Sequence, residues 1–378
     1  MTTVVPMGEL RGPTAERDAE PTPRHAERLP RTARNGRDLL AWGLVDADAV
    51  ADVDEVTENF AMAVTSAMLE LIDVTEVDDP IRRQFVPTMR ELVMLAEERA
   101  DPIGDEPHEA VDGVVHRYPD RALLKAIHVC PVYCRFCFRR EKVGPGSETL
   151  SETQLEAAFV YIRSHPEIWE VILTGGDPLI LKPRRLGSIV AGLDAIPTVE
   201  VIRIHTRVPV VAPARVTDEL VTSLKVSKPV YVVLHCNHPR ELTEEAVAAC
   251  GRLVDAGIPM LNQSVLLRGV NDDKPTMEAL LRALVRARVK PYYLHHGDLA
   301  LGTSHFRTTI EEGQALMREL RGRVSGICQP TYVLDIPGGY GKVPIGPNYL
   351  AREGDRWRVE DIHGDVHLYP PRSGTSDD

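Results

Sequence analysis

The sequence contains few cysteines, no long apolar run and no excess of basic residues. Six cysteines in 378 residues are too few for a disulfide scaffold. No run approaches the roughly 18 consecutive apolar residues that a membrane-spanning helix needs. The formal net charge is -12, from 44 basic and 56 acidic residues. Because this balance leaves no surplus of cations to neutralise phosphates, it argues against a general binder of nucleic acid or of membrane surfaces.

The composition that is present, 43% hydrophobic and 26% charged residues, is that of an ordinary soluble protein. The length suggests two or three domains, or one barrel-sized domain with extensions. Residues 1–30 contain no apolar segment of the secretory type. Three of the six cysteines fall within eight positions, a pattern that indicates metal chemistry in a reducing compartment. We therefore expect a cytoplasmic α/β enzyme.

The two ends and the N-terminal part of the chain differ from its middle. Residues 1–37 are rich in Pro, Arg, Glu and Thr and predict a disordered arm, and residues 372–378 predict a frayed tail. Residues 38–114 predict a helical extension, because apolar side chains recur at three- and four-residue steps. These side chains are Phe60, Val64, Met68, Leu71 and Ile72 in one stretch, and Phe85, Met89, Leu92, Val93 and Leu95 in another. Pro87 is expected to start or kink the second helix.

Residues 115–330 alternate between short apolar runs and amphipathic stretches. The candidate strands span 123–129, 170–174, 199–205, 230–235, 260–267 and 289–294, and candidate helices between them include 243–256 and 275–287. From the second run onward the strands start about every 30 residues, the length of a βα unit. Repeated βα units predict an α/β fold with a partial (β/α)6-type parallel barrel. Residues 331–371 are expected to form a C-terminal segment beside it.

Polar residues follow four of the candidate strands. They stand at 175–177, 205–207, 235–237 and 295–298. In a parallel sheet the carboxyl ends of the strands lie at one edge, where reactive side chains belong. Loops after strands are polar in many proteins, but this pattern favours an active rim.

Three cysteines stand close together after the first candidate strand of the barrel. Cys130, Cys134 and Cys137 have the spacing C-x3-C-x2-C. Three thiolates on one tight loop can each hold one iron of a four-iron cluster and leave the fourth iron without a protein ligand. A structural zinc site would need a fourth ligand, for which His128 is available, and that alternative stays open.

A second motif, DIPGGYGKVP at 335–344, carries one lysine after a glycine-rich stretch. It is not a phosphate-binding P-loop, because Ile336 stands where glycine is required and Val343 where serine or threonine is required. Lys342 could form a Schiff base with pyridoxal phosphate. The spacing alone favours that interpretation only slightly over a solvated loop lysine.

Taken together, the motifs resemble a known group of enzymes. The cysteine loop resembles that of the radical S-adenosylmethionine superfamily, and Gly175-Gly176-Asp177-Pro178 is similar to its glycine-rich turn. With the lysine loop, the chain resembles the lysine 2,3-aminomutase family from about Val115 to Tyr349. The likeness includes HRYPDR at 116–121, HFRT at 305–308 and PNY at 347–349.

This resemblance implies a [4Fe-4S] cluster, S-adenosyl-L-methionine and pyridoxal 5'-phosphate as cofactors. It further implies an electron donor such as a flavodoxin or ferredoxin, and a homo-oligomer. The residues it assigns are Cys130, Cys134 and Cys137 for the cluster; Gly175, Gly176, Asp177, His235 and Gln263 for S-adenosylmethionine; Lys342, Arg117, Tyr118 and Arg121 for pyridoxal phosphate; and Arg139, Asp298 and Asp335 for the substrate. Lys342 would be the catalytic Schiff-base lysine, and Arg139 would bind the substrate carboxylate.

The implied reaction moves the α-amino group of L-lysine to C3 and gives β-lysine, through a 5'-deoxyadenosyl radical and a pyridoxal phosphate aldimine. Asp298 and Asp335 match the acids that hold the distal ammonium group of lysine. Two carboxylates that converge on one pocket bind a cation strongly and repel a carboxylate tail. The pair therefore favours a basic amino acid over glutamate.

Three departures from the family pattern keep alternatives open. His295 stands where a tyrosine beside pyridoxal phosphate is expected, and Phe136 where a histidine that contacts S-adenosylmethionine is expected. No cysteine follows Cys328, so the cysteine-rich zinc-binding tail of the clostridial type is absent. The alternatives are the same chemistry on another amino acid such as arginine, a radical enzyme without pyridoxal phosphate, and a non-catalytic zinc-binding protein.

Overall fold

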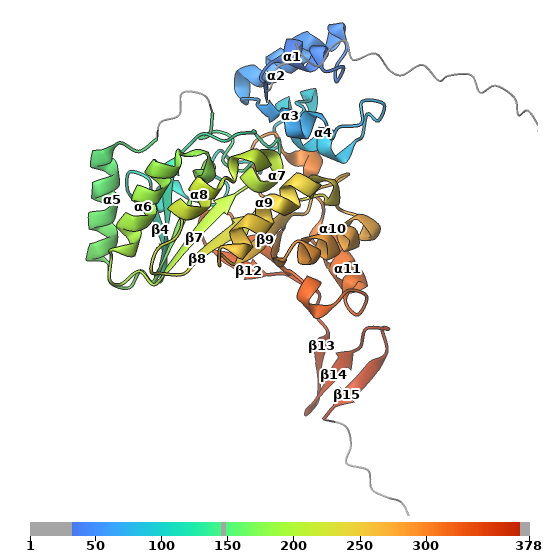
Figure 1. The fold of residues 1–378 in the computed structure, drawn as a ribbon. Helices are drawn as coiled ribbons and strands as arrows, with labels where there is room; N and C mark the ends of the chain where they lie inside the picture. The colour runs from blue at the N-terminus through green and yellow to red at the C-terminus, as the bar shows by residue number, and fades with distance from the viewer. Residues whose placement is uncertain (1–31, 145–148, 371–378) are drawn as a thin grey trace, which may run out of the picture.

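The computed structural model describes residues 32–144 and 149–370. In this part of the chain ten strands form one curved sheet, in the order β12-β11-β10-β9-β8-β7-β6-β5-β4-β3 (Figure 1). The strands are β3 (Glu109–Val111), β4 (Val114–Tyr118), β5 (Arg121–Ile127), β6 (Glu170–Gly175), β7 (Val201–Thr206), β8 (Val230–Leu234), β9 (Met260–Val265), β10 (Val289–His295), β11 (Thr331–Asp335) and β12 (Lys342–Pro344). Strands β5 to β11 run parallel, and β3, β4 and β12 are antiparallel to their neighbours. The described edge strands β3 and β12 do not pair, so the sheet is a partial barrel, as predicted.

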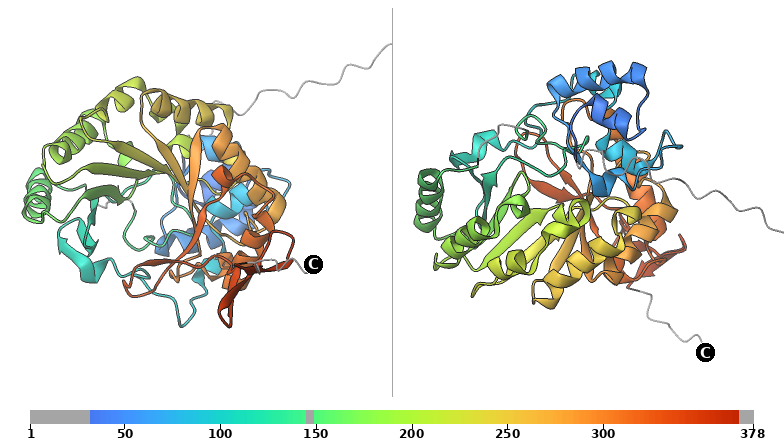
Figure 2. Two further views of the ribbon diagram at one scale, coloured as in Figure 1. Left: turned by 90° about the horizontal axis from the view of Figure 1, so that it is seen from below. Right: turned by 45° about the horizontal axis from the view of Figure 1, so that its top comes forward.

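Helices cover the outer face of this sheet and leave its inner face for the site (Figure 2). They are α5 (Glu152–Ser164), α6 (Pro183–Asp194), α7 (Val208–Val211), α8 (Asp218–Ser223), α9 (Glu244–Asp255), α10 (Lys274–Arg286) and α11 (Ile310–Leu320). Helix α9 shows why these segments are helical. Thr243 caps its first turn by accepting a hydrogen bond from Ala246 N, and Ala246, Ala249 and Leu253 are buried at helical spacing. The main hydrophobic core lies between such faces and the sheet.

The six predicted barrel strands are confirmed, and their ends differ from the prediction by two residues or fewer. Strands such as β8, with buried valines on successive positions, are apolar on both faces, which is typical of a parallel sheet covered by helices. The prediction did not include β11 in the barrel. It pairs with β10 as a seventh parallel strand, with Leu294 opposite Tyr332. The longer connection before β11 breaks the regular spacing that revealed the other strands.

The N-terminal region differs from the prediction of two long helices. It contains the short helices α1 (Gly36–Ala41), α2 (Val50–Asn59), α3 (Ser66–Leu69) and α4 (Pro80–Phe85), and the strands β1 (Thr32–Ala33) and β2 (Val64–Thr65). Pro80 starts α4 and Pro87 follows its end, since a proline lacks the amide donor that a helix interior requires. Phe60 and Met68 are buried as expected, but Met89, Val93 and Leu95 are exposed, so no helix face runs through 81–98.

The predicted boundaries of this region shift as well. Strand β1 and the start of α1 fall within the arm predicted to extend to 37, and β3 and β4 occupy 109–118 within the stretch predicted as helical. Residues 1–31 and 372–378, which carry the rest of the predicted arm and the predicted tail, lie outside the described residues. None of the helices within 32–144 and 149–370 has the length and apolar character to span a bilayer.

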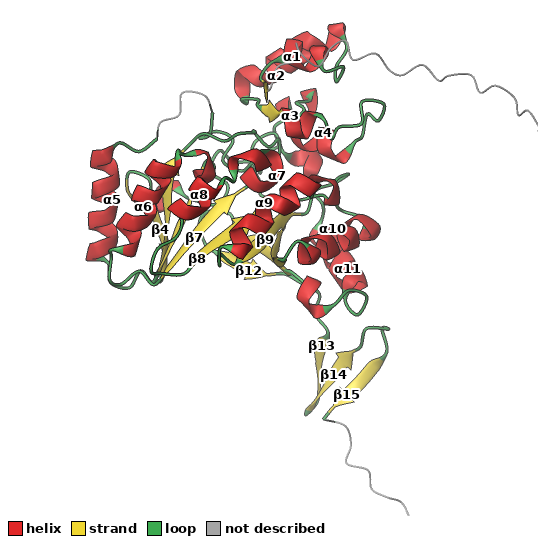
Figure 3. Cartoon of the chain, viewed as in Figure 1, coloured by secondary structure: helices red, strands yellow, loops and turns green. Residues whose placement is uncertain are grey.

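A second, smaller sheet lies at the C-terminal end of the described chain. It consists of β13 (Leu350–Glu353), β14 (Arg356–Glu360) and β15 (Val366–Tyr369), all antiparallel. Figure 3 shows it projecting away from the barrel. It contributes no side chain to the cavity described next.

Candidate active site

A cavity of about 590 Å³ lies within the curve of the sheet. Every site residue named from the sequence lines it: Cys130, Cys134, Cys137, Lys342, Arg117, Tyr118, Arg121, Gly175, Gly176, Asp177, His235, Gln263, Arg139, Asp298 and Asp335. These residues come from strands β4 to β12 and from the loops that follow them. The fold therefore gathers side chains from positions 117 to 342 of the sequence into one space.

The cysteine loop follows β5 and faces the cavity with all three thiols. Cys130, Cys134 and Cys137 are free. Burial raises the pKa of Cys137 to about 11 and that of Cys130 well above its ordinary value, with neighbouring negative charges adding to both shifts. Among the described residues, no three His, Cys, Asp or Glu side chains are grouped to hold a single metal ion. A four-iron cluster does not require such a group, because each thiolate binds its own iron.

The glycine turn after β6 packs directly against the backbone that leads into the cysteine loop. Gly176 N donates to Ile127 O at 2.5 Å, and Asp177 N donates to Val129 O at 3.0 Å. Gly175 has a φ of +103°, which favours glycine. A Cβ on Gly176 would lie 2.3 Å from Val129 O. Only a residue without a side chain permits this approach.

We expect Gly176→Ala to force the ends of β5 and β6 apart. Overpacking of this kind costs about 1–3 kcal/mol in the free energy of unfolding, and we expect S-adenosylmethionine affinity to fall at least about tenfold. Urea unfolding and calorimetric titration of the reconstituted protein measure both quantities. Gly326→Ala is the matched control, because a Cβ there meets nothing within 4 Å. Unchanged affinity in Gly176→Ala would contradict this interpretation of the turn.

Asp177, which the resemblance assigns to S-adenosylmethionine, lines the cavity and is held by the chain segments around it. In the structure its carboxylate accepts hydrogen bonds from Leu179 N at 3.0 Å, Thr206 Oγ1 at 2.7 Å and Arg207 N at 2.7 Å. These contacts tie the end of β6 to the end of β7. Asp177 therefore braces the rim of the sheet.

The amide of Gln263 lies between two imidazole rings. Its Nε2 is 2.5 Å from His235 Nε2 and 3.2 Å from His205 Nδ1. Burial lowers the pKa of His235 to about 3, and that of His205 falls well below its ordinary value for the same reason. Both rings are therefore neutral at pH 7 and act as polar, uncharged partners of the Gln263 amide.

Lys342 reaches the cavity from the edge strand β12. Its backbone amide donates to the Tyr118 hydroxyl at 2.7 Å, and its ammonium group forms an ion pair with Asp335. Gly341, just before it, has a φ of +92° and packs against Tyr118. The glycine-rich loop thus turns back sharply and places the lysine against the opposite strand, β11.

Two arginines flank Tyr118 beside this lysine. The Arg121 guanidinium lies 3.8 Å from the centroid of the Tyr118 ring, and that of Arg117 lies 5.4 Å from it. Arg117 also donates to Ile103 O at 2.5 Å, and Arg121 forms an ion pair with Asp120 at 2.7 Å. The arrangement brings two guanidinium groups, a phenol and an amine to one end of the cavity. The guanidinium groups and the phenol can donate hydrogen bonds to a phosphate, and the amine can condense with an aldehyde.

Arg139 already has an acidic partner. Its Nε and one terminal nitrogen donate to Asp105 at 3.1 and 3.0 Å, and it lies 3.4 Å from Thr174 Oγ1. Burial by itself would raise the pKa of Asp105, but the charge of Arg139 holds it below its ordinary value. Asp105 gave no signal in the sequence. A substrate carboxylate at Arg139 would therefore share the guanidinium with Asp105.

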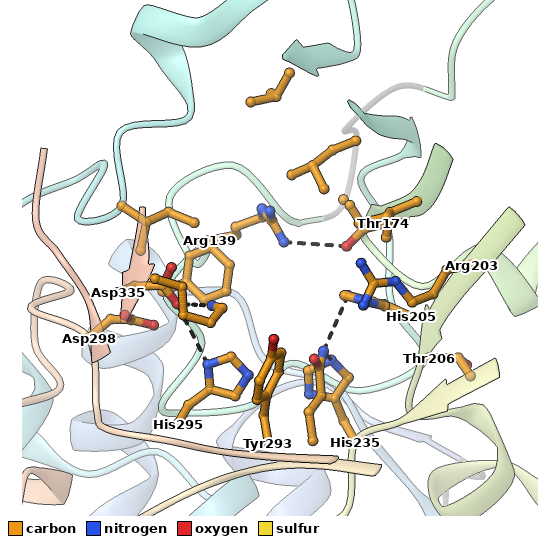
Figure 4. A pocket seen from close by; sticks show the side chains of 18 of the residues that line it. Arg139, Thr174, Arg203, His205, Thr206, His235, Tyr293, His295, Asp298 and Asp335 are labelled. Atoms are coloured by element: carbon orange, nitrogen blue, oxygen red, sulfur yellow. Dashed lines mark hydrogen bonds and ion pairs between the residues drawn. The ribbon is translucent and has the colours of Figure 1, made fainter. Parts of the chain in front are cut away.

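Asp298 and Asp335 lie together on one side of the cavity, beside His295 and across from Thr174 and His205 (Figure 4). Burial raises the pKa of Asp298 to about 7, and the negative charge of Asp335 adds to the shift. Burial alone would also raise the pKa of Asp335, but the contacts with His295 and Lys342 lower it. One acid of the pair is thus firmly ionised and the other titrates near neutrality.

Two of the three departures from the family pattern, His295 and Phe136, lie in defined surroundings. His295 Nδ1 is 3.6 Å from Asp335 Oδ2, and burial together with the charge of Lys342 lowers its pKa. Phe136 packs edge-on against Phe306, with ring centroids 6.0 Å apart. His295 therefore joins the lysine and acid group, whereas Phe136 is an apolar part of the wall.

The sequence did not reveal the network that holds the cysteine loop. Glu91 is fully buried in the N-terminal region and accepts hydrogen bonds from Arg135 Nε at 3.0 Å and from Arg140. Arg135 also donates to Ala61 O at 2.8 Å. The side chains of two arginines on either side of Cys137 in the sequence are thus fixed by one carboxylate that lies 44 and 49 residues earlier in the chain. No pattern in the sequence signals such a pair.

Comparison with known proteins identifies the class and then the family. A model of the radical SAM superfamily matches residues 124–281, so the open barrel with its cysteine loop is that of a radical S-adenosylmethionine enzyme. A model described as lysine-2,3-aminomutase matches residues 317–371. The chain belongs to the lysine 2,3-aminomutase family, and it is an isomerase.

Three relatives illustrate the similarity. The chain is 43% identical to the L-lysine 2,3-aminomutase of Clostridium subterminale over 84% of this chain and 76% of that protein. It is 46% identical to the L-lysine 2,3-aminomutase of Acetoanaerobium sticklandii, over 80% and 73% of the two chains. It is also 40% identical to the glutamate 2,3-aminomutase of Clostridioides difficile, over 80% and 71%. Family membership alone therefore does not decide the amino acid.

The family uses a [4Fe-4S] cluster, S-adenosylmethionine and pyridoxal phosphate, and the residues of the cavity fit these groups. Three cysteines line it from one loop, and Gly175 and Gly176 line it beside them without side chains that would occupy the space. One buried polar atom each of His205, His295 and Asp335 has no hydrogen-bond partner in residues 32–144 and 149–370. Such atoms in a cavity are typical of a site that binds a polar ligand.

Proposed function

We propose that this protein is an L-lysine 2,3-aminomutase, which interconverts L-lysine and β-lysine. The observation that carries the proposal is the pair of acids, Asp298 and Asp335, inside the same cavity as the cysteine loop and Lys342. A cationic side chain would be bound by this pair, whereas the carboxylate of glutamate would be repelled. Relatives named as L-lysine 2,3-aminomutases support the same substrate.

Each cofactor is assigned its own group of cavity residues in this proposal. We assign the cluster to Cys130, Cys134 and Cys137; S-adenosylmethionine to Gly175, Gly176, Asp177, His235 and Gln263; and pyridoxal phosphate to Lys342, Arg117, Tyr118 and Arg121. When bound, these groups supply hydrogen-atom abstraction by the 5'-deoxyadenosyl radical and a π system through which the amino nitrogen migrates. The chain supplies the orientation of the bound groups.

The substrate is held at its two ends. Arg139 binds its carboxylate, sharing the guanidinium with Asp105, and the two acids bind its distal ammonium group. With both ends fixed, the carbon chain cannot rotate and C3 stays in one position relative to the cofactors. The neutral rings of His205 and His235 add no charge that would compete for either end.

The charge of Asp298 predicts how activity depends on pH. Below its pKa of about 7 the carboxyl group is protonated and attracts an ammonium group less, so we expect kcat/KM for lysine to rise with pH up to about 7 and then level off. A folded-state pKa above the ordinary 3.8 also means that the free enzyme loses stability as pH rises between those values. The bound ammonium group offsets that loss.

A pH profile of kcat/KM from 5.5 to 8.5 at constant ionic strength tests this expectation. Asp298→Asn should remove the slope and lower kcat/KM for lysine about tenfold or more, since the charge is lost at every pH. Asp255→Asn, an exposed acid paired with Arg288, is the control and should keep the wild-type profile. A slope that persists in Asp298→Asn would assign the titration to another group.

The substrate proposal is tested by anaerobic turnover of the reconstituted protein with S-adenosylmethionine, pyridoxal phosphate and dithionite. L-lysine, L-arginine and L-glutamate are supplied together, and the products are resolved by mass spectrometry. β-Lysine as the main product would support the proposal. β-Arginine alone would agree with the role of the two acids but would show that lysine is not the substrate. β-Glutamate would contradict the role of the acids.

The remaining assignments concern partners. A radical S-adenosylmethionine enzyme needs a reductant, and we propose a low-potential flavodoxin or ferredoxin. We further propose a homo-oligomer that acts in the reducing cytoplasm. Size-exclusion chromatography with light scattering tests the oligomer, and turnover with each reduced donor protein tests the reductant.

A further inference from the structure

Arg207 contacts a cysteine of the cluster loop although it belongs to a distant part of the barrel. It directly follows β7 and is 6% exposed. One terminal nitrogen of its guanidinium donates to Cys134 Sγ at 2.9 Å. The other donates to Gln84 Oε1 at 2.6 Å and to Glu241 Oε2 at 2.7 Å. The Arg207 guanidinium thus donates to a thiol through one terminal nitrogen and to two oxygen acceptors through the other.

The surroundings fix this side chain in place. Gln84 lies at the end of α4, in the N-terminal region, and Glu241 lies in the loop after β8. Both are fully buried, and Gln84 Nε2 donates to Glu241 Oε1 at 3.1 Å. The rings of Phe85 and Phe136 lie 4.7 and 5.4 Å from the guanidinium carbon. Arg207 therefore cannot swing away from Cys134 without leaving buried partners unpaired.

The Arg207 guanidinium has a carboxylate on the side away from the thiol of Cys134. Glu241 is its one ionic partner in the described residues, and the same carboxylate also accepts from Asn237 N at 3.1 Å and His238 N at 3.0 Å. The charge of Glu241 is thus spread over several donors. The N–H group that points at Cys134 remains as a positive end directed at the sulfur.

We propose that Arg207 is a positioning residue that raises the reduction potential of the iron–sulfur cluster through its hydrogen bond to the thiolate of Cys134. Reduction adds one electron, from a low-potential one-electron donor, so the reduced cluster carries one more negative charge than the oxidised one. A buried cation that donates to a ligand sulfur stabilises the more negative state. Hydrogen bonds to cluster sulfurs and local charge are general determinants of such potentials.

This role goes beyond the proposed reaction, because it concerns electron entry and does not depend on the amino acid that the enzyme uses. It also gives the N-terminal region a function in the site. Gln84 holds the guanidinium from outside the barrel, so the region around α4 helps to set the environment of the cluster. A replacement such as Gln84→Met removes the acceptor and keeps the volume. It should lower the reduction potential of the cluster, by less than removal of the Arg207 guanidinium does.

The test is a redox titration of the reconstituted full chain without substrate or S-adenosylmethionine, followed by electron paramagnetic resonance. Three variants are compared with the wild type: Arg207→Gln, Arg207→Lys and the control Arg252→Gln. Arg252 is a half-buried arginine whose guanidinium donates to Val216 O at 2.6 Å and to Pro213 O at 3.4 Å, both in the connection after β7. Iron and sulfide content and thermal unfolding of the cluster-free proteins are measured alongside.

In Arg207→Gln we expect the ratio of reduced to oxidised cluster at a fixed potential to fall at least tenfold, which is 59 mV for a one-electron couple. Arg207→Lys keeps the positive charge but loses the planar guanidinium, so its reduction potential should lie between those of Arg207→Gln and the wild type. Arg252→Gln should match the wild type.

An unchanged potential in a fully loaded Arg207→Gln protein would overturn the proposal. If that variant does not assemble a cluster, Arg207→Lys decides by the same titration. Loss of the cluster from both variants, with wild-type unfolding of the cluster-free proteins, would make Arg207 a structural support of the loop and would also overturn it. None of these outcomes depends on whether lysine is the substrate, so a failure here is distinct from a failure of the proposed function.

Discussion

Replacement of Lys342 by alanine is expected to reduce turnover by at least about 10³-fold, because covalent attachment of the cofactor is lost outright. Of the described residues that line the cavity, Lys342 is the one lysine. Its ammonium group forms an ion pair with Asp335 and lies 5.8 Å from the centroid of the Tyr293 ring. No other primary amine of this wall could take its place.

The measurement combines turnover with mass spectrometry after borohydride reduction. The wild type should carry one reduced pyridoxyl group on the peptide that contains Lys342, and the alanine variant should carry none. Lys342→Arg keeps the positive charge beside Asp335 but cannot form a Schiff base. It should be as inactive as Lys342→Ala while unfolding at the wild-type temperature. Appreciable turnover in either variant would contradict the assignment of Lys342.

Replacement of Glu91 by glutamine is expected to lower the free energy of unfolding by about 3–5 kcal/mol, because it leaves two buried guanidinium groups without their carboxylate. Burial by itself would raise the pKa of Glu91, but Arg135 and Arg140 hold it below its ordinary value, so it is charged at neutral pH. A lowered pKa contributes stability above the ordinary carboxyl value that is lost as the pH falls through the folded-state value. The free energy of unfolding of the variant should therefore decrease less than that of the wild type as the pH falls.

Urea unfolding of the cluster-free protein at several pH values measures this loss. Glu97→Gln is the matched control. Glu97 lies six residues after Glu91, is half exposed, and forms an ion pair with Arg307 at 3.3 Å. Its effect should stay within about 0.5 kcal/mol. Because Arg135 and Arg140 flank Cys137, we also expect the Glu91→Gln protein to lose iron faster on exposure to a chelator. A change below about 1 kcal/mol would mean that water reaches the two arginines.

The sequence predicted the features that depend on neighbouring residues. The cysteine spacing, the Gly-Gly-Asp-Pro turn and the lysine loop are each contiguous, so their chemistry can be inferred without a fold. Likewise, the strands β5 to β10 were predicted because parallel strands buried on both faces are continuous apolar runs at regular intervals. The N-terminal region has helices as predicted, but they are short, and the predicted helix through 81–98 was wrong. Its apolar residues have helical spacing, but prolines and the pairing of β1 with β2 break the helices.

The tertiary structure decided how these features meet. Asp298 comes together with Asp335 because β10 pairs with β11, and Lys342 joins them because β12 turns back against β11. The contacts between Arg139 and Asp105, between Glu91 and the cysteine loop, and between Arg207 and Cys134 join residues 34 to 73 positions apart. Buried polar contacts of this kind have no regular spacing along the chain, because any fold that brings two such side chains together can form them. The sequence by itself therefore determined which chemistry this protein carries, and only the packed sheet decided which charges surround it, because the pKa of a group depends on neighbours that the fold supplies.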